Sequence, residues 1–201
     1  YVVALKDSAL VELLPQITDG KSEKALFVHT AGSIPMTIWE GYAGHYGVFY
    51  PMQTFSKVRD VDFRTIPVFI EAKQIADLEL LKKIGDTLSE TVLEADSEQR
   101  RYLHLSAVFV CNFANHMFTV GERLLQEHHL PFNVMYPLLK ETTEKVLSGI
   151  NPSEAQTGPA VRYDENVMSK HIQLSAHPAW QHLYEEISKS IYHDKLRFEE
   201  D

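Results

Sequence analysis

The chain has 201 residues, of which 44% are hydrophobic and 23% charged, the balance of an ordinary soluble globular protein. Its formal net charge is −9, and the acidity lies in the second part: residues 1–73 hold 7 basic and 8 acidic side chains, and residues 74–201 hold 12 and 20. This balance excludes an extended nucleic-acid surface on the second part, because phosphate binding needs clustered Lys and Arg.

The first third of the chain alternates short strands with short helices. Strands are predicted at residues 1–5, 25–29, 46–50 and 66–71, and Asp7 or Ser8 is expected to cap a helix after the first strand. Such alternation favours a largely parallel sheet with helices outside it. The first strand begins at residue 1 without a polar lead-in, so we expect further sequence upstream of it.

From residue 73 the pattern becomes helical. A helix is predicted over 75–88, then a short extended piece at 91–94, then a long helix that begins after Asp96 or Ser97 and runs to about residue 126. Further helices are predicted over 131–149, 165–175 and 178–196, and the domain boundary near residues 71–75.

The long helix carries apolar residues around much of its circumference, including Phe109, Phe113, Met117 and Phe118. A helix that is apolar on nearly all sides needs cover on all sides. We therefore expect a homodimer built on the helical part.

Cys111 is the single cysteine, so no intrachain disulfide can form and a reduced, cytoplasmic setting is expected. Nothing resembles a signal peptide, and no uninterrupted apolar run approaches the ~18 residues of a membrane span. No His-Glu-x-x-His, paired-Cys, Gly-x-Gly-x-x-Gly or Walker motif occurs, which argues against a metal site and leaves the phosphate-gripping part of a nucleotide site unaccounted for.

The turn His29-Thr30-Ala31-Gly32-Ser33 follows a predicted buried strand. Ligands of open parallel sheets bind beyond the carboxyl ends of strands, and small residues there allow a ring or a phosphate to approach the backbone. The alternative is a tight strand–helix turn that needs Gly for conformational reasons.

A polar stripe interrupts the long helix. His104, Asn112 and Asn115 stand at i, i+8 and i+11, and so share one face of a regular helix. They either satisfy each other in a core network or line a cleft, where His104 is the one group that could move a proton near neutral pH.

The long loop over 151–164 contains a Gly-Pro turn followed by Arg162 and Asp164. Arg162 can bind a carboxylate or a phosphate in bidentate fashion. The alternative is a surface pair between Arg162 and Asp164, worth under ~1 kcal/mol.

Four motifs occur in order along the chain: His29-Thr30-Ala31-Gly32-Ser33, Tyr50-Pro51-Met52-Gln53-Thr54-Phe55, Tyr102-Leu103-His104 leading to Asn112-Phe113, and Thr157-Gly158-Pro159 with Arg162, Asp164 and His171. Together they resemble a bacterial family of Rossmann-like proteins with a C-terminal domain of unknown function. Its members are often labelled NADP oxidoreductases of the deazaflavin-coenzyme-dependent type and are similar to pyrroline-carboxylate and hydroxyacid reductases. The likeness covers nearly the whole chain.

The resemblance implies two domains. Residues 1–73 would be the C-terminal part of a Rossmann-like nucleotide-binding domain whose N-terminal part, roughly 50–60 residues with the glycine-rich turn, is missing. Residues 74–201 would be a helical dimerisation and substrate domain like those of hydroxyacid and pyrroline-carboxylate reductases. Tyr50 stands where the family usually has His.

The resemblance further implies an NADP-dependent oxidoreductase that reduces a small oxo or imino substrate at a cleft between the two domains; NAD is not excluded. His104 would donate the proton, Asn112 would orient the substrate, and Asn115 and Arg162 would bind it. The cofactor would lie across the strand ends, against Leu5, Lys6, Asp7, His29, Thr30, Ala31 and Gly32. The alternative is a non-catalytic nucleotide-binding or dimerisation module of the same fold.

Overall fold

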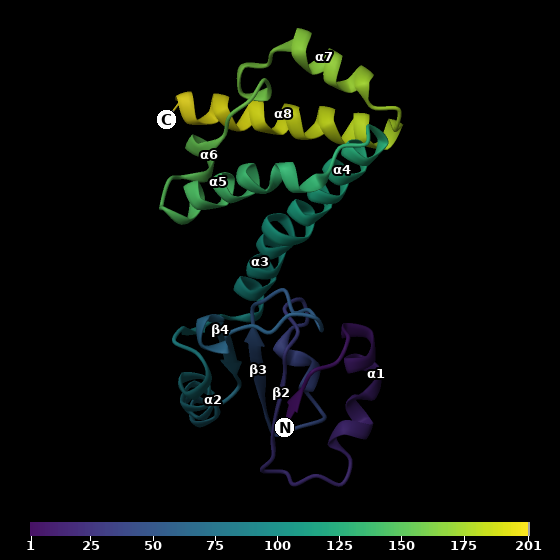
Figure 1. The fold of residues 1–201 in the computed structure, drawn as a ribbon. Coiled ribbons are helices and arrows are strands. Elements are labelled where there is room, and N and C mark those ends of the chain that lie inside the picture. The colour runs from purple at the N-terminus through teal and green to yellow at the C-terminus, as the bar shows by residue number, and fades with distance from the viewer. Residues whose placement is uncertain (201) are drawn as a thin grey trace. The chain divides into compact units, whose positions relative to one another are not determined.

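The structure is a computed structural model that describes residues 1–200, with side chains described as far as residue 197. The chain forms two compact units, an α/β unit over Tyr1–Ala114 and a helical unit that begins at Asn115 (Figure 1). The division falls later in the chain than the boundary predicted near residues 71–75, because the elements that follow that point still pack on the sheet.

The α/β unit is built on one five-stranded sheet in the order β1-β2-β3-β4-β5. The strands are β1 (Val2–Val3), β2 (Leu26–His29), β3 (His45–Pro51), β4 (Val68–Ala72) and β5 (Val92–Glu94). The pairs β1/β2, β2/β3 and β4/β5 are parallel, which confirms the predicted parallel sheet and the pairing of its first two strands. The pair β3/β4 is antiparallel because the connection between these strands contains a 3-10 turn, η2 (Phe63–Thr65), and no crossover helix.

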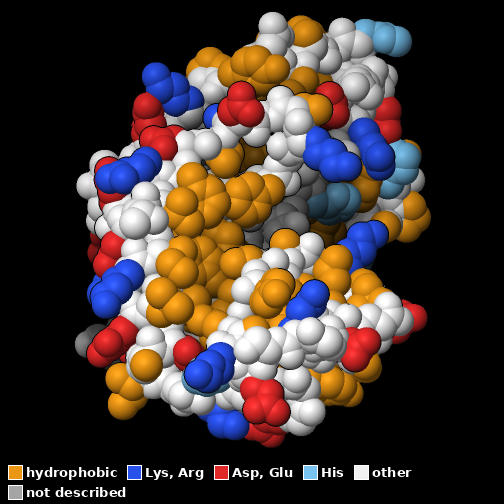
Figure 2. Space-filling model, turned by 90° about the horizontal axis from the view of Figure 1, so that it is seen from below, with side chains coloured by type: hydrophobic (Ala, Val, Ile, Leu, Met, Phe, Trp, Pro, Cys, Tyr) orange, Lys and Arg blue, Asp and Glu red, His pale blue; other side chains and the backbone are white. Residues whose placement is uncertain are grey.

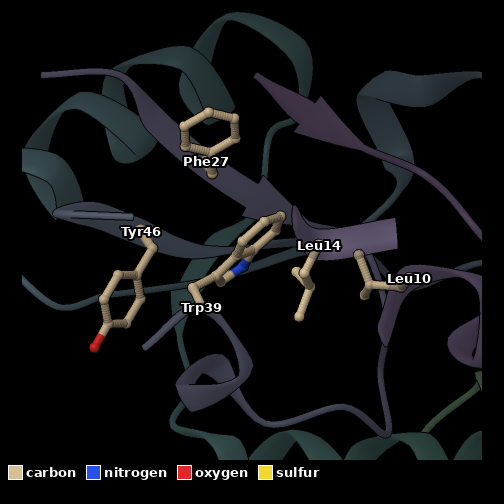
Figure 3. Packing of buried hydrophobic residues seen from close by; sticks show 5 residues of the cluster. All are labelled: Leu10, Leu14, Phe27, Trp39 and Tyr46. Carbon is tan, nitrogen blue, oxygen red and sulfur yellow. The ribbon is translucent and has the colours of Figure 1, made fainter. Parts of the chain in front are cut away.

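One face of the sheet is covered by helix α1 (Asp7–Thr18) and the short 3-10 helix η1 (Met36–Trp39). Trp39 is fully buried between these elements, with its ring 5.7 Å from that of Phe27 (Figure 3). The other members of this cluster are Leu10, Leu14 and Tyr46. The cluster holds η1 against the end of β2, and so fixes where the turn after β2 lies.

The opposite face of the sheet is covered by helix α2 (Ile75–Leu88). Leu81 of this helix is buried against Val28, Val68 and Ile70 of the sheet. Side chains alternate between the two faces along each strand, so Phe27 lies with α1 whereas Val28 lies with α2.

Helix α3 (Ser97–Ala107) returns to the first face of the sheet. Asp96 caps it as predicted: its carboxylate accepts hydrogen bonds from the backbone N–H groups of Glu98, at 2.9 Å, and Gln99, at 2.8 Å. The helix continues without a break through a π-helical segment, η3 (Val108–Phe113), into α4 (Ala114–Glu127).

A buried ion pair fastens α3 to the sheet. The Nη1 atom of Arg100, whose side chain is 1% exposed, lies 2.5 Å from Oε2 of Glu71 on β4. The Nη2 atom of Arg100 donates to the carbonyl of Ile34 at 2.7 Å. The hydroxyl of Ser97 donates to Glu71 at 2.8 Å and accepts from the N–H of Met36 at 3.0 Å. One network thus joins α3, β4 and the segment that precedes η1.

The helical unit continues from α4 through six further elements within the described residues. They are η4 (Phe132–Met135), α5 (Tyr136–Leu147), α6 (Pro152–Ala155), η5 (Ala160–Arg162), α7 (Glu165–Leu174) and α8 (Pro178–Glu200). Apart from β5, the residues from 75 onward contain no strand within the described part of the chain, as predicted.

The charged side chains are mixed on the face of the molecule in Figure 2. Lys and Arg are interspersed there with Asp and Glu, and apolar side chains form a contiguous area among them. This face carries no continuous basic stripe of the kind that nucleic acids bind.

Candidate functional site

The turn that follows β2 is shaped by His29, whose side chain is fully buried. Its Nδ1 atom accepts a hydrogen bond from the N–H of Ala31 at 3.2 Å, and its ring stacks near Trp39. Burial, assisted by the positive charge of Arg100, lowers the pKa of His29 to about 4. The ring is therefore neutral and enclosed by protein.

Gly32 lies where this turn meets two side chains from other elements. A Cβ atom at this position would come within 2.8 Å of Nδ1 of His104 and 2.9 Å of the Tyr50 hydroxyl. The backbone of Gly32 does not adopt the left-handed conformation. Glycine is therefore needed at this position because it has no side chain, and its conformational freedom is not required. The structure therefore brings the predicted turn and the predicted proton donor into contact.

Tyr50 and His104 form a hydrogen-bonded pair beside Gly32. The Tyr50 hydroxyl lies 3.3 Å from Nδ1 of His104, and the two rings meet edge to face. Burial raises the pKa of Tyr50, and the charge of Arg100 opposes that effect only in part. The hydroxyl therefore keeps its proton at neutral pH.

His104 itself is exposed, and it stands one helical turn after the buried Arg100. Its recorded partner is Tyr50 of the sheet rather than Asn112 or Asn115. The core network considered as an alternative is therefore not formed in the described part of this chain.

A hollow of about 260 Å³ opens beside the pair. It is lined by the end of β3, the loop that follows and the α3–η3 helix, including Tyr50, Gln53, Thr54, His104, Cys111 and Asn112. The lining contains no Asp, Glu, Lys or Arg. The hollow thus offers one imidazole, surrounded by the Cys111 thiol and by neutral polar and apolar side chains.

The π-helical segment changes the register of the predicted stripe. In a π-helix each N–H bonds to the carbonyl five residues earlier, so each turn contains more residues than an α-helical turn. The eight-residue step from His104 to Asn112 is therefore closer to two whole turns, and the two side chains lie closer to the same face. His104 and Asn112 accordingly line the same hollow, and Asn115 does not belong to its lining. The regular-helix geometry assumed for the stripe was wrong, because η3 lies between its members.

The ends of β1 and β2 are tied together at the same edge of the sheet. The hydroxyl of Ser33 donates a hydrogen bond to the Asp7 carboxylate, so Asp7 does not cap α1 as expected. Leu5, Lys6 and Asp7 are exposed. Thr30 and Ala31 are half-buried, and the Thr30 hydroxyl has no recorded partner within residues 1–200. This edge therefore leaves a hydroxyl, an ammonium and a carboxylate open to a ligand.

Asn115 and Arg162 belong to the helical unit. Both are exposed, and no ion pair of Arg162 is recorded among the described residues. Asp164, its alternative partner, instead caps α7 by accepting from the N–H of Val167 at 3.2 Å. The roles of Asn115 and Arg162 stay predictions.

Two functional elements were missed from the sequence. The Arg100–Glu71 pair escaped notice, although a charged residue on an otherwise apolar strand (Phe69-Ile70-Glu71) was a signal for it. From the sequence, Tyr50 is only a departure from a family motif, whereas in the structure it is the hydrogen-bond partner of His104.

No group of three metal-ligating side chains occurs within the described residues.

The chain was compared with known protein families and with solved structures, and both comparisons found matches. The model of a family described as a domain of unknown function, DUF2520, matches residues 66–191. The crystal structure of a Bacteroides fragilis protein, provisionally described as an NADP oxidoreductase, is 59% identical, with a TM-score of 0.91 over 96% of this chain and 74% of that one. No protein with a curated description matches.

Two more distant structures share the fold. A Thermotoga maritima protein has a TM-score of 0.76 at 20% identity, over 96% of this chain and 77% of that one. An NADH-preferring ketol-acid reductoisomerase from an uncultured archaeon has a TM-score of 0.53 at 17% identity, over 98% and 65%. These likenesses concern the fold alone.

Substitution of Gly32 by Ala tests the contact between the turn and the pair. The new methyl group must displace the Tyr50 or His104 side chain, so we expect the free energy of unfolding in urea to fall by about 1–3 kcal/mol. Gly121→Ala is the matched control, because a Cβ there meets nothing and the glycine lies inside α4; it should raise stability by ~0.5–1 kcal/mol. A Gly32→Ala variant as stable as the wild type would contradict the observed packing.

Proposed function

Since the chain belongs to the DUF2520 family, we propose that it is an NADP-dependent oxidoreductase that reduces a small oxo or imino substrate. The observation that carries the proposal is the contact between Gly32, at the carboxyl end of β2, and the exposed His104, which lines a hollow. A group able to donate a proton thus stands where ligands of parallel sheets bind. The choice of NADP rests on the description of the Bacteroides fragilis relative.

In this proposal a nicotinamide nucleotide lies against the edge formed by β1 and β2. The hydrogen bond from Ser33 to Asp7 holds the two strand ends together, and the Thr30 hydroxyl is available within the described residues to a ribose or amide group. Leu5, Lys6 and Asp7 would contact the cofactor from β1, and the backbone from His29 to Gly32 from β2. When bound, the cofactor supplies the hydride.

His104 supplies the proton. As hydride reaches the carbon of a C=O or C=N group, the oxygen or nitrogen gains negative charge, and the imidazolium of His104 protonates it. The neutral lining of the hollow suits an uncharged oxo or imino group, and the amide of Asn112 orients it by hydrogen bonding. The exposed guanidinium of Arg162, which belongs to the helical unit, is proposed to bind an acid group of the substrate.

Substitution of His104 by Gln tests this role. Glutamine keeps a polar side chain but cannot exchange a proton near neutral pH, so turnover on a panel of small imines and oxo acids should fall ~10²–10⁴-fold. The melting temperature should change little because His104 is exposed. The readout is cofactor oxidation, followed by nicotinamide absorbance on the full-length protein.

The matched control is His116→Gln, which changes an exposed histidine of α4 with no recorded partner in the described chain and should leave turnover intact. Equal turnover for His104→Gln and the wild type would refute the catalytic role. Nucleotide binding without turnover by the wild type on any substrate would favour the non-catalytic module instead.

We further propose that the protein is a homodimer through its long helix. The continuous helix Ser97–Glu127 is long and apolar enough to cross a membrane, which is weak evidence on its own. Its most apolar stretch of 18 residues has a mean hydropathy of 1.2, and none of that stretch is buried. Its side chains include Phe109, 59% exposed, and Phe113, 50% exposed. In the helical unit, α4, α7 and α8 also line an apolar hollow of about 530 Å³. A second copy that covers such surfaces removes them from water, and the polar Asn112, Asn115 and His116 suit a protein interface better than a bilayer.

Light scattering of the purified protein without detergent should give twice the monomer mass at micromolar concentration. Phe109→Glu should shift the mass toward the monomer, because a charge would be buried in the interface. Val58→Glu, in a loop where Val58 is 95% exposed, should leave the dimer intact. A monomer mass for the wild type would count against the dimer, and a need for detergent would favour a membrane.

A further inference from the structure

We propose that Tyr50 is the positioning residue of His104. Its hydroxyl is hydrogen-bonded to Nδ1, so that Nε2 is the atom that exchanges the proton with the substrate. The proposal rests on the proposed function for the meaning of that exchange. The geometry of the pair stands independently of it.

The contacts leave Tyr50 little freedom. Its side chain is 8% exposed, its ring packs near that of Phe69, and its hydroxyl also touches the position of Gly32. His104 is the one recorded hydrogen-bond partner of this hydroxyl within residues 1–200. A nearly buried hydroxyl held on a β-strand therefore sets the position of an otherwise exposed imidazole.

The hydroxyl can serve Nδ1 in both protonation states of His104. It donates to Nδ1 when the neutral ring carries its proton on Nε2, and it accepts from the Nδ1–H group when the ring is charged or has just released its Nε2 proton. Nε2 has no recorded partner in the described part of the chain, and His104 lines the hollow. The proton that reaches the substrate is therefore the one on Nε2.

The charged form gains more from this contact than the neutral form. Hydrogen bonds in which one partner is ionised are roughly twice as strong as neutral ones. The other titratable groups on the elements around His104 include Arg100, Arg101 and Tyr102 on α3, Glu71 on β4, the neutral His29, Asp7, which is bound to Ser33, and Cys111, which lines the same hollow. Of the side chains around His104, the Tyr50 hydroxyl is the one that hydrogen-bonds its ring within the described residues.

Tyr50→Phe tests the proposal, because phenylalanine keeps the ring and removes only the oxygen. The NMR titration of the His104 ring should move to lower pH, since the charged ring loses its hydrogen-bond acceptor. The alkaline limb of the pH profile of kcat/KM should move in the same direction, because the reaction needs protonated His104. We expect kcat to fall roughly 10-fold.

Tyr46→Phe is the matched control. Tyr46 lies on the same strand, is 1% exposed, and has a hydroxyl that donates to Glu40 at 3.2 Å instead of to a histidine. This variant loses a hydroxyl from another buried tyrosine of the same strand, so it reports the purely structural effect. Its His104 titration and pH profile should match the wild type.

The two readouts separate the possible failures. A His104 titration that is unchanged in Tyr50→Phe, with the amide spectrum of the fold intact, would overturn the positioning role whether or not turnover is found. A shifted titration in a protein without turnover on any substrate would sustain the positioning of His104 and refute the proposed oxidoreductase activity. Equal shifts of the His104 titration in Tyr50→Phe and Tyr46→Phe would also overturn the positioning role of Tyr50.

Discussion

The ion pair between Arg100 and Glu71 is the interaction on which the rest of the α/β unit depends. Nearly buried charges are costly to remove from water, and they are tolerated only when hydrogen bonds satisfy their remaining donors and acceptors. Here the Ile34 carbonyl and the Ser97 hydroxyl supply those bonds for Nη2 of Arg100 and for the Glu71 carboxylate, while Nε of Arg100 stays buried without a partner in the described part of the chain. Unlike apolar packing, such a network has one satisfactory geometry, so it fixes both the rotation and the height of α3 on the sheet.

The position of His104 follows from that geometry. One helical turn beyond Arg100, the helix carries His104 to the turn after β2, where a glycine is needed because no Cβ fits. Tyr50 then holds the imidazole from the sheet, and η3 brings Asn112 to the same hollow. Burial, assisted by the same guanidinium, lowers the pKa of His29, so one of two nearby histidines is enclosed and neutral while the other is open to solvent. A single anchored helix thus assembles residues from four parts of the chain.

Local patterns in the sequence predicted the elements well and the contacts between them less well. The strong periodicities identified β1 and β2 as parallel neighbours and the residues after 75 as helical, and the Asp96 cap is a signal within four residues. By contrast, the Arg100–Glu71 pair joins residues 29 apart, and no local pattern encodes which strand a helix will meet. The π-helical segment leaves no mark on a 3.6-residue period, which is why Asn115 was placed with His104 and Asn112. Gly32 was noticed, but its cause, a close approach by two distant side chains, appears only in three dimensions.

Comparison of Arg100→Met with the double variant Arg100→Met/Glu71→Met tests the central claim most directly. The single variant leaves the Glu71 carboxylate without its partner, so its free energy of unfolding should fall by ~3–5 kcal/mol, with displaced NMR signals from the Gly32 amide and the His104 ring. The double variant should recover much of that stability, because apolar side chains then fill the site. An Arg100→Met protein that unfolds like the wild type, with the Gly32 and His104 signals unmoved, would contradict the account.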